Sequence, residues 1–333
     1  MRAMVMNRGG DVNLSLLELR ELPTPEPGPG FVRVKVSVCG VCRTDIHIVE
    51  EELPPAKRPI VPGHEVVGIV DRVGSGVHAI KEGDRVGIAW LQQTCGRCEF
   101  CARGRENLCA RATFTGYHKD GGYAEYAVVP ETFAYPIPAL FTDEEAAPLL
   151  CAGIIGYRAL RLSGVRPGQR LGLYGFGASA HLTIQIAREW GCSVYVCSLR
   201  EEHRKLARDL GAVWVGGAAE APPDKLHGAI IFAPAGEIVP VALRALDRGG
   251  TVAIAGIHMT DIPPINYDRD LFGERTIRSV TANTKQDGLD LLREAAAIPI
   301  RPHTQRFRLE EANQALQQLK AGTIQGAAVL TME

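Results

Sequence analysis

Residues 171–200, LGLYGFGASAHLTIQIAREWGCSVYVCSLR, have the pattern of a strand, a tight glycine turn, a helix and a second strand. The turn, residues 175–180, reads G-x-G-x-x-A. Gly175 permits the tight turn, Gly177 lets the backbone approach a pyrophosphate, and the small Ala180 lets helix and strand pack closely. A glycine turn alone would also suit an ordinary α/β protein. Its place between a strand and a helix favours dinucleotide binding.

The residues expected to contact the dinucleotide lie at the turn and at the tip of the second strand. The helix N-terminus offers unpaired N–H groups and a positive dipole end to phosphate. At the strand tip, Ser198 and Arg200 stand where an acidic residue would hold a ribose 2′-hydroxyl group. A hydroxyl and a guanidinium suit a 2′-phosphate, so we favour NADP over NAD; the alternative is that Arg200 begins a solvated helix. The predicted cofactor-binding residues here are Gly175, Phe176, Gly177, Ala178, Ser198 and Arg200.

Alternating strands and helices continue beyond this stretch and predict an α/β fold with a doubly wound parallel sheet. We expect helices over 201–210 and 238–246, strands over 212–215, 229–233 and 251–255, and an edge strand over 277–280 that could pair across a dimer. Before the stretch, Thr142 and Glu145 form a capping box. The apolar pattern of residues 146–162 then predicts one helix despite Pro148.

Length and composition indicate two domains and no nucleic-acid or membrane partner. A chain of 333 residues with 46% hydrophobic residues supports two cores, and its net charge of −1 carries no electrostatic footprint for nucleic acid. The N-terminus lacks a signal-like segment, and no apolar run reaches the roughly 18 residues of a membrane span, so we expect a cytoplasmic protein. Nine cysteines in such a chain favour metal binding or catalysis over disulfides.

Four cysteines form the strongest single motif. Cys95, Cys98, Cys101 and Cys109 have the spacing C-x2-C-x2-C-x7-C. Four thiolates on a short loop can complete a tetrahedral zinc site with no open position for chemistry, which is typical of structural zinc. Binding energies on the order of 10 kcal/mol allow such a site to fold a loop without its own core. The alternative is a set of reduced thiols.

Two shorter motifs are ambiguous by themselves. Cys39 and Cys42 form a C-x-x-C pair, and spacing alone does not separate a metal ligand from a small buried thiol. His64, followed by Glu65, is as consistent with a structural histidine as with a metal ligand beside a carboxylate. Neither motif alone predicts a catalytic site.

The motifs together resemble the zinc-dependent alcohol dehydrogenases of the medium-chain dehydrogenase/reductase family. The resemblance runs in order through CGVCRTDIH (39–47), PGHE (62–65), KEGDRV (81–86), the four-cysteine block and GGYAEY (121–126). It implies a β-rich GroES-like catalytic domain with a zinc-binding lobe, together with a Rossmann domain. On this basis we expect the catalytic domain over 1–152 and 286–333, the lobe at about 91–112, and the Rossmann dinucleotide-binding domain over 153–285.

The resemblance also implies a second, catalytic zinc. Its ligands would be Cys42 rather than Cys39, His64 and Cys151, with Glu65 behind the metal as an exchangeable ligand. Two cysteines and one histidine leave a fourth position for water or substrate. Zinc lowers the pKa of bound water to roughly 7. We expect a bound alcohol to be acidified in the same way, which prepares its carbon to release hydride.

Three further residues would serve this centre by the same resemblance. Thr44 and His47 would pass the released proton outward, and a histidine suits this role because it titrates near working pH. The alternative for His47 is a solvated surface histidine. Asp45 would accept a hydrogen bond from His64 and orient it.

Contacts to cofactor and substrate complete the expected site. Arg43 resembles a contact to the cofactor pyrophosphate, and Gly256 and Ile257 lie where the family meets the nicotinamide half. Trp90 and Leu91 are candidates for the wall of the substrate pocket, although ordinary strand packing would explain them too.

These residues together predict a zinc-dependent alcohol dehydrogenase that uses NADP or NAD. Its substrates would be primary or secondary alcohols with the matching aldehydes or ketones, and it would form a homodimer or homotetramer. A polyol or amino-acid alcohol dehydrogenase of the same family is the alternative enzyme. A zinc-free reductase would leave Cys42, His64 and Cys151 without a shared purpose, and a non-catalytic dinucleotide-binding sensor would need no proton relay.

Overall fold

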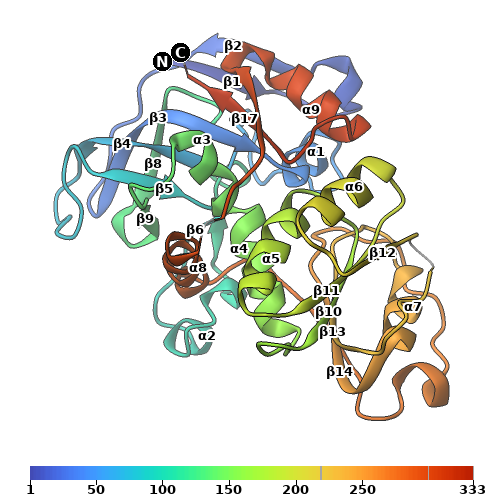
Figure 1. Cartoon of the computed structure of the whole chain (residues 1–333). Coiled ribbons are helices and arrows are strands. Elements are labelled where there is room, and N and C mark those ends of the chain that lie inside the picture. The colour runs from blue at the N-terminus through green and yellow to red at the C-terminus, as the bar shows by residue number, and fades with distance from the viewer. Residues whose placement is uncertain (218–219, 299, 333) are drawn as a thin grey trace. The chain divides into compact units, whose positions relative to one another are not determined.

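The computed structural model in Figure 1 describes residues 1–217, 220–298 and 300–332. It divides into two compact units. The first comprises Met1–Cys151, Asn283–Ala296 and Arg301–Glu333, and the second comprises Ala152–Ala282 and Ala297–Ile300. Ala297, Ile298 and Ile300, which the sequence analysis assigns to the catalytic domain, therefore group with the second unit. The chain passes from one unit to the other directly after Cys151 and returns at Asn283.

The first unit is mainly β-structure, organised around the long strand β3. Its strands are β1 (Arg2–Met6), β2 (Leu17–Glu21), β3 (Phe31–Val41), β4 (Glu65–Val73), β5 (Arg85–Ile88), β6 (Leu91–Gln93), β7 (Thr113–Phe114), β8 (Tyr126–Pro130), β9 (Ala134–Pro136), β16 (Thr304–Arg308) and β17 (Ala327–Thr331). Its helices are α1 (Arg43–Val49), α2 (Glu99–Ala102), α3 (Asp143–Ala146), α8 (Lys285–Ala297) and α9 (Ala312–Ala321).

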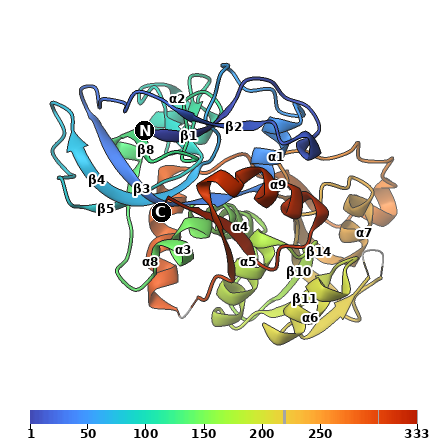
Figure 2. The same cartoon turned by 90° about the horizontal axis from the view of Figure 1, so that it is seen from above.

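Strand β3 forms because its first four valines alternate with polar residues, and this period of two places those valines on one face. Val32, Val34, Val36 and Val38 are all at most 3% exposed. The first half of β3 pairs with β8 and its second half with β17, while β4 runs beside most of its length. The resulting sheet has the order β16-β17-β3-β4-β5-β9. Figure 2 shows β3, β4 and β5 as one curved layer.

The second unit is the predicted doubly wound α/β domain. Its elements are α4 (Ala152–Leu162), β10 (Arg170–Tyr174), α5 (Ala178–Glu189), β11 (Ser193–Cys197), α6 (Glu201–Asp209), β12 (Trp214–Gly216), β13 (Leu226–Ile231), α7 (Ile238–Ala245), β14 (Leu246–Ile254) and β15 (Thr276–Ser279). The six strands are all parallel, in the order β12-β11-β10-β13-β14-β15. The strand order reverses at β10, which is where such sheets bind dinucleotides. Figure 1 shows α4 and α5 on one side of this sheet and α7 on the other.

Several predicted boundaries differ from the observed ones. Strand β12 begins at Trp214 rather than at residue 212, and β13 ends at Ile231 rather than at residue 233. Strand β15 lies at the sheet edge, as expected. None of the helices in the described part of the chain is long and apolar enough to cross a membrane.

The single helix predicted over residues 146–162 is wrong. Helix α3 ends at Ala146, a 3-10 turn follows over Ala147–Leu150, and α4 begins only at Ala152. Pro148 has no N–H group, so it cannot continue the helical hydrogen-bond ladder. Cys151 then adopts φ −128° and ψ −69°, outside the helical region. The break therefore gives Cys151 a backbone conformation that differs from the one it would have in a continuous helix.

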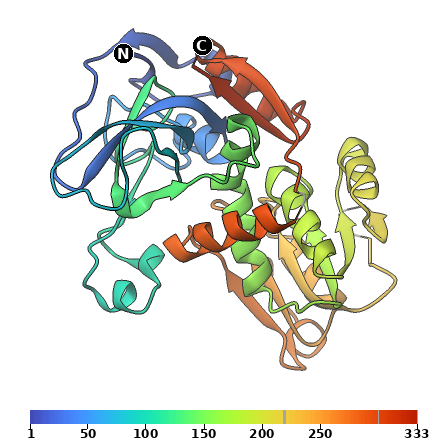
Figure 3. The same cartoon turned by 60° about the vertical axis from the view of Figure 1, so that its left-hand side comes forward.

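The four-cysteine loop forms a lobe of the first unit with little regular structure. Figure 3 shows this teal segment, which carries α2, extending away from the sheet. It is tied to α8, because the backbone N–H of Lys285 donates to Glu106 Oε1 at 2.6 Å. Thr284 and Asp287 also exchange hydrogen bonds at the start of α8. The lobe and the returning chain are therefore connected within the first unit.

Candidate metal centres and dinucleotide site

Cys42, His64, Glu65 and Cys151 converge in the first unit, and their ligand atoms lie within 4.8 Å of one another. Cys42 directly precedes α1, His64 and Glu65 stand at the start of β4, and Cys151 occupies the break before α4. The Sγ atoms of Cys42 and Cys151 are 3.7 Å apart. The structure thus brings together the four residues that the sequence analysis assigns to a catalytic metal.

Cys39 has a different environment from Cys42, although the two share one motif. It lies in β3, is fully buried, and its Sγ is 3.5 Å from the carbonyl oxygen of Gly40. Burial raises the pKa of the Cys39 thiol well above its usual value. It behaves as a core thiol, whereas Cys42 faces the other candidate ligands.

The chemistry of this group fits a zinc ion. The Nε2 atom of His64 is buried and has no hydrogen-bond partner among the described residues, an arrangement that is costly unless something binds the nitrogen. A hydrogen bond from Cys151, together with His64, lowers the pKa of Cys42 well below its usual value against the effect of burial. The same contact and burial raise the pKa of Cys151. The Cys42 thiol therefore releases its proton more readily than the Cys151 thiol, and a bound zinc ion, which prefers thiolate sulfur, would stabilise the deprotonated form of both.

Asp45 orients the candidate ligands His64 and Cys42 by hydrogen bonds. Its side chain is fully buried, and Oδ1 accepts from His64 Nδ1 and from the backbone N–H of Gly63, both at 3.2 Å. Oδ2 accepts from the backbone N–H of Cys42 at 2.9 Å. Burial alone would lower the pKa of His64, but Asp45 and Cys42 raise it well above its usual value. With Nδ1 held by Asp45, the imidazole presents Nε2 to the space shared with the other candidate ligands.

Glu65 lies against Gly40, and this contact depends on the glycine. Glu65 is 2% exposed, and a Cβ atom added at Gly40 would lie 1.8 Å from Glu65 Oε2. A larger residue at position 40 would therefore displace the carboxylate from the ligand group.

Helix α1 carries the two residues predicted for proton transfer. Thr44 and His47 are three positions apart, so they share one face of the helix. Thr44 Oγ1 lies 3.7 Å from Cys42 Sγ. His47 is only 6% exposed and pairs through Nδ1 with Glu52. The alternative reading of His47 as a solvated surface histidine is wrong.

Glu52 is a residue that sequence reasoning missed. It ends a run of three glutamates, and such a run is typical of a solvated surface. The only available signal was its position five residues after His47. Because α1 ends at Val49 and the chain then turns, this spacing brings Glu52 back to the His47 side chain.

Aromatic side chains surround the His64 side of the centre. Trp90 is 8% exposed, and its ring centroid lies 5.0 Å from that of His64 at an interplanar angle of 72°. Trp90 also stacks on Phe114 at 5.0 Å and tilts against Tyr117 at 5.8 Å. Leu91 is completely buried. Sequence analysis proposed Trp90 and Leu91 as pocket residues and did not include Phe114 or Tyr117.

The second group of cysteines forms the lobe. The Sγ atoms of Cys95, Cys98, Cys101 and Cys109 all lie within 4.8 Å of one another. Cys98 and Cys101 are 3.5 Å apart, and Cys95 and Cys101 are 3.9 Å apart. Four sulfur ligands without a water position are typical of structural zinc.

The glycine turn of the second unit has the expected conformation. Gly175 has φ +87°, a conformation that favours glycine, and an added Cβ atom would lie 2.9 Å from the backbone nitrogen of Ala233. Gly177 is the N-cap residue of α5 and makes no side-chain cap, and a Cβ atom there would meet no protein atom within 4 Å. Phe176 is buried, and Ala178 is the first residue of α5. The turn therefore leaves room beside the helix N-terminus for a phosphate group.

The remaining predicted cofactor residues lie at strand ends or on the surface. Ser198 follows β11 and is buried, and Arg200 directly precedes α6 and is exposed. Gly256 and Ile257 follow the end of β14, and Ile257 is 50% exposed. Arg43 is exposed at the start of α1 in the first unit.

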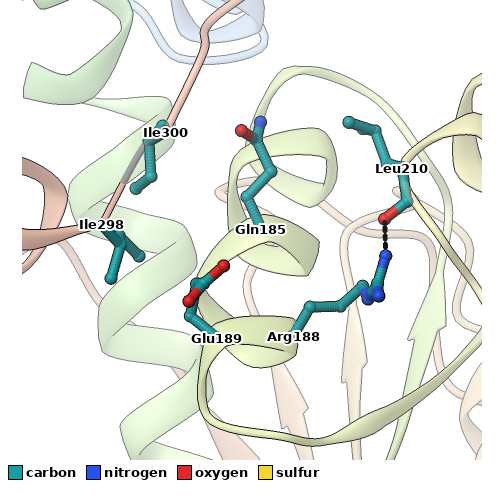
Figure 4. A pocket seen from close by; sticks show the side chains of 6 residues that line it. All are labelled: Gln185, Arg188, Glu189, Leu210, Ile298 and Ile300. Atoms are coloured by element: carbon teal, nitrogen blue, oxygen red, sulfur yellow. Dashed lines mark hydrogen bonds between the residues drawn. The ribbon is translucent and has the colours of Figure 1, made fainter.

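A hollow of about 200 Å³ lies elsewhere in the second unit (Figure 4). Its lining residues are Gln185, Arg188, Glu189, Leu210, Ile298 and Ile300. Arg188 donates to the carbonyl oxygen of Leu210 at 3.1 Å. Because Gln185, Arg188 and Glu189 lie at the C-terminal end of α5, the hollow is separate from the glycine turn at the other end of this helix.

Comparison with known proteins decides the family. The alcohol dehydrogenase GroES-like domain matches residues 28–139, and the zinc-binding dehydrogenase domain matches residues 180–297. The Mycobacterium tuberculosis protein named "Probable alcohol dehydrogenase AdhA" is 50% identical, over 99% of this chain and 97% of that protein. This chain belongs to the zinc-dependent alcohol dehydrogenases of the medium-chain dehydrogenase/reductase family. The predicted family and fold are thereby confirmed.

Two solved structures show the same fold with dinucleotides bound. Acetophenone reductase from Geotrichum candidum in complex with NAD has a TM-score of 0.89 and 26% identity, over 99% of this dehydrogenase and 96% of the reductase. A zinc-binding dehydrogenase structure from Sinorhizobium meliloti 1021 bound to NADP has a TM-score of 0.85 and 29% identity, over 99% and 98% of the two chains. The dehydrogenase is thus an enzyme of a fold that accepts NAD or NADP.

Replacing Gly177 by alanine should separate cofactor binding from folding. The added methyl group meets no protein atom, so we expect an unchanged melting temperature. It would stand where the pyrophosphate approaches, and we expect at least about a tenfold increase in the Kd for NADPH, measured by fluorescence titration. Gly28→Ala is the matched control, because its Cβ atom also meets nothing within 4 Å. Unchanged NADPH binding in Gly177→Ala would contradict the assignment of the turn.

Zinc binding to the lobe should weaken as the pH falls. Hydrogen bonds from the Arg97 backbone and the Arg111 side chain lower the pKa of Cys95 to about 5. A hydrogen bond from the backbone of Cys101 lowers the pKa of Cys98. Desolvation and the neighbouring thiols outweigh this effect and raise the pKa of Cys98 to about 11. At neutral pH Cys95 is therefore a thiolate, while Cys98 must release a proton on binding zinc. We expect the apparent Kd to rise about tenfold per pH unit for each released proton as the pH falls.

This dependence can be measured by calorimetry in buffers of different ionisation enthalpy, with Cys42→Ala used to restrict binding to the lobe. Below a pH of about 5, Cys95 also becomes protonated and the affinity should fall more steeply. An affinity that does not change with pH near neutrality would exclude the four-thiolate site.

Proposed function

We propose that this dehydrogenase interconverts primary or secondary alcohols and the matching aldehydes or ketones, with NAD or NADP as the hydride carrier. The observation that carries the proposal is the group of Cys42, His64 and Cys151, in which a buried imidazole nitrogen without a described hydrogen-bond partner faces two thiols. Three such ligands suit a zinc ion with one open position. The names of the relatives support the same reaction class.

The residues of the chain would have distinct tasks in this reaction. Cys42, His64 and Cys151 would hold zinc, which when bound supplies Lewis-acid polarisation of the substrate oxygen. Asp45 keeps the His64 imidazole oriented through Nδ1. Glu65, buried beside these ligands, would serve as the exchangeable carboxylate ligand.

Thr44 and His47 would move the proton of the alcohol outward. Thr44 stands beside Cys42, and its hydroxyl group can donate and accept in the same step. Glu52 engages Nδ1 of His47, so the proton would be received at Nε2. The carboxylate would then stabilise the imidazolium.

Replacing Cys42 by alanine tests the catalytic zinc. We expect two zinc ions per wild-type chain, one per Cys42→Ala chain, and loss of alcohol oxidation in the variant with NADPH binding retained. Metal analysis by mass spectrometry, turnover of a short alcohol panel and fluorescence titration provide the three readouts. Cys39→Ala is the matched control, because Cys39 lies in β3 outside the ligand group. Turnover that survives in Cys42→Ala would refute the proposal.

The proton path predicts a separate kinetic effect. We expect His47→Gln to lower kcat on the order of 100-fold at neutral pH, because general acid–base catalysis typically contributes at least that factor. The zinc content and the NADPH affinity should not change, since His47 is not among the metal ligands. Steady-state kinetics across a pH series provide the measurement, and a wild-type profile in His47→Gln would remove this residue from the path.

We further propose that NADP is preferred over NAD. Ser198 and Arg200 stand at the end of β11, where a ribose 2′-substituent is read in this fold. Arg204 supports the same loop by donating to the carbonyl oxygen of Ser198 at 3.3 Å. Arg43 would contact the pyrophosphate, and Gly256 and Ile257 the nicotinamide half.

Replacing Arg200 by alanine tests the cofactor preference. Loss of a charge-assisted bond to a 2′-phosphate should raise the KM for NADP by about tenfold or more and leave the KM for NAD unchanged. Arg208→Ala is the control, because Arg208 lies on α6, the helix that follows Arg200, and is ion-paired with Glu201. A wild-type enzyme that prefers NAD would keep the zinc mechanism and contradict the proposed role of Arg200.

We propose Trp90 and Leu91 as part of the substrate pocket wall. The apolar rings of Trp90, Phe114 and Tyr117 favour alcohols with apolar substituents over polyols, because they offer few hydrogen-bond partners. We also propose a homo-oligomer that forms through the edge strand β15. We also propose a cytoplasmic location, because a reducing compartment would keep the two cysteine groups available as metal ligands.

A further inference from the structure

Tyr123 gives the buried carboxylate of Asp45 its fourth hydrogen bond. The hydroxyl group donates to Asp45 Oδ2 at 3.1 Å, and both side chains are completely buried. This tyrosine is neither a candidate metal ligand nor part of the proton path. Its contact therefore needs a separate explanation.

The four bonds to Asp45 are divided evenly between its two oxygens. Oδ1 accepts from Gly63 and His64, and Oδ2 accepts from Cys42 and Tyr123. Three of the donors belong to metal-ligand segments of the chain. Tyr123 is the donor that comes from outside these segments, and it shares Oδ2 with the backbone N–H of Cys42.

The backbone of Tyr123 supports the same loop. Its N–H donates to the carbonyl oxygen of Pro62 at 3.0 Å, and the N–H of Gly122 donates to that of Gly63 at 3.0 Å. Gly63 has φ +93°, and an added Cβ atom would lie 2.3 Å from Tyr123 Cδ1. The tyrosine ring thus packs directly on the residue before His64.

We propose that Tyr123 is a positioning residue of the catalytic metal centre, because its hydroxyl group locks Asp45 in the orientation that aims His64 and anchors Cys42. The inference rests on the proposed function, since it concerns the same zinc site. Burial and the charge of Asp45 raise the pKa of Tyr123 well above its usual value, so the hydroxyl stays protonated and acts as a donor. Residues of this kind typically change metal affinity about 10- to 100-fold.

Replacing Tyr123 by phenylalanine isolates the hydroxyl group, because the ring and its packing on Gly63 remain. We expect zinc in the catalytic site to be released to EDTA about 10- to 100-fold faster, while release from the lobe is unchanged. The kinetic phase of zinc release that is missing in Cys42→Ala identifies the catalytic zinc. In the cobalt(II)-substituted enzyme, the visible absorption bands of the catalytic site should shift.

Tyr135→Phe is the matched control. Tyr135 is also buried in the first unit, and its hydroxyl accepts from Asn283 Nδ2 at 3.4 Å rather than contacting Asp45. It should lose a similar amount of thermal stability without a change in zinc release. In an Asp45→Asn background, Tyr123→Phe should have a much smaller further effect, because the charged acceptor is gone.

Equal zinc release and equal cobalt spectra in Tyr123→Phe and wild type would overturn the inference. So would a loss confined to thermal stability and matched by Tyr135→Phe. Failure of the proposed function gives a different result, because wild-type enzyme depleted of the catalytic zinc would then keep its turnover. If turnover requires zinc and Tyr123→Phe retains it normally, only the role of Tyr123 is wrong.

Discussion

A single buried carboxylate holds the catalytic side of this enzyme together. Asp45 lies inside the first unit without solvent exposure. Burying a carboxylate is costly unless hydrogen-bond donors replace the water that it loses. The donors come from the end of β3, from the loop before β4 and from the segment before β8. Three stretches of chain that are far apart in sequence are therefore fixed relative to one another by one charge.

The glycines around this carboxylate follow from the same constraint. Gly63 and Gly121 approach so closely that a Cβ atom at Gly121 would lie 2.0 Å from the carbonyl oxygen of Gly63. Gly40 likewise allows the Glu65 carboxylate to approach the backbone, because a Cβ atom there would lie 1.8 Å from Oε2. Glycine is needed at these positions because the backbones of the loops that carry the candidate ligands approach each other too closely for a Cβ atom.

The sequence predicted those features that depend on local pattern or on ordered motifs. The glycine turn, the parallel sheet and the alternating strand β3 follow from periodicity, and the two cysteine groups follow from spacing and family resemblance. The interruption at Cys151 was not predicted, because an apolar run reads as helix and one proline does not reveal where the helix resumes. Glu52 and Tyr123 were missed because their partners are set by tertiary contacts, which no local pattern encodes.

The two cysteine groups also stand beside the two main points where the chain leaves and re-enters the first unit. Cys151, a candidate ligand, is the last residue before the first crossing. Lys285, two residues after the return at Asn283, is held by Glu106, which lies between Cys101 and Cys109 in the lobe. Each metal ion would thus act as a clamp at the base of one connecting segment. Metal loss would then free the ends of these connecting segments that lie in the first unit, and protease nicking near residues 152 and 283 would be its earliest sign.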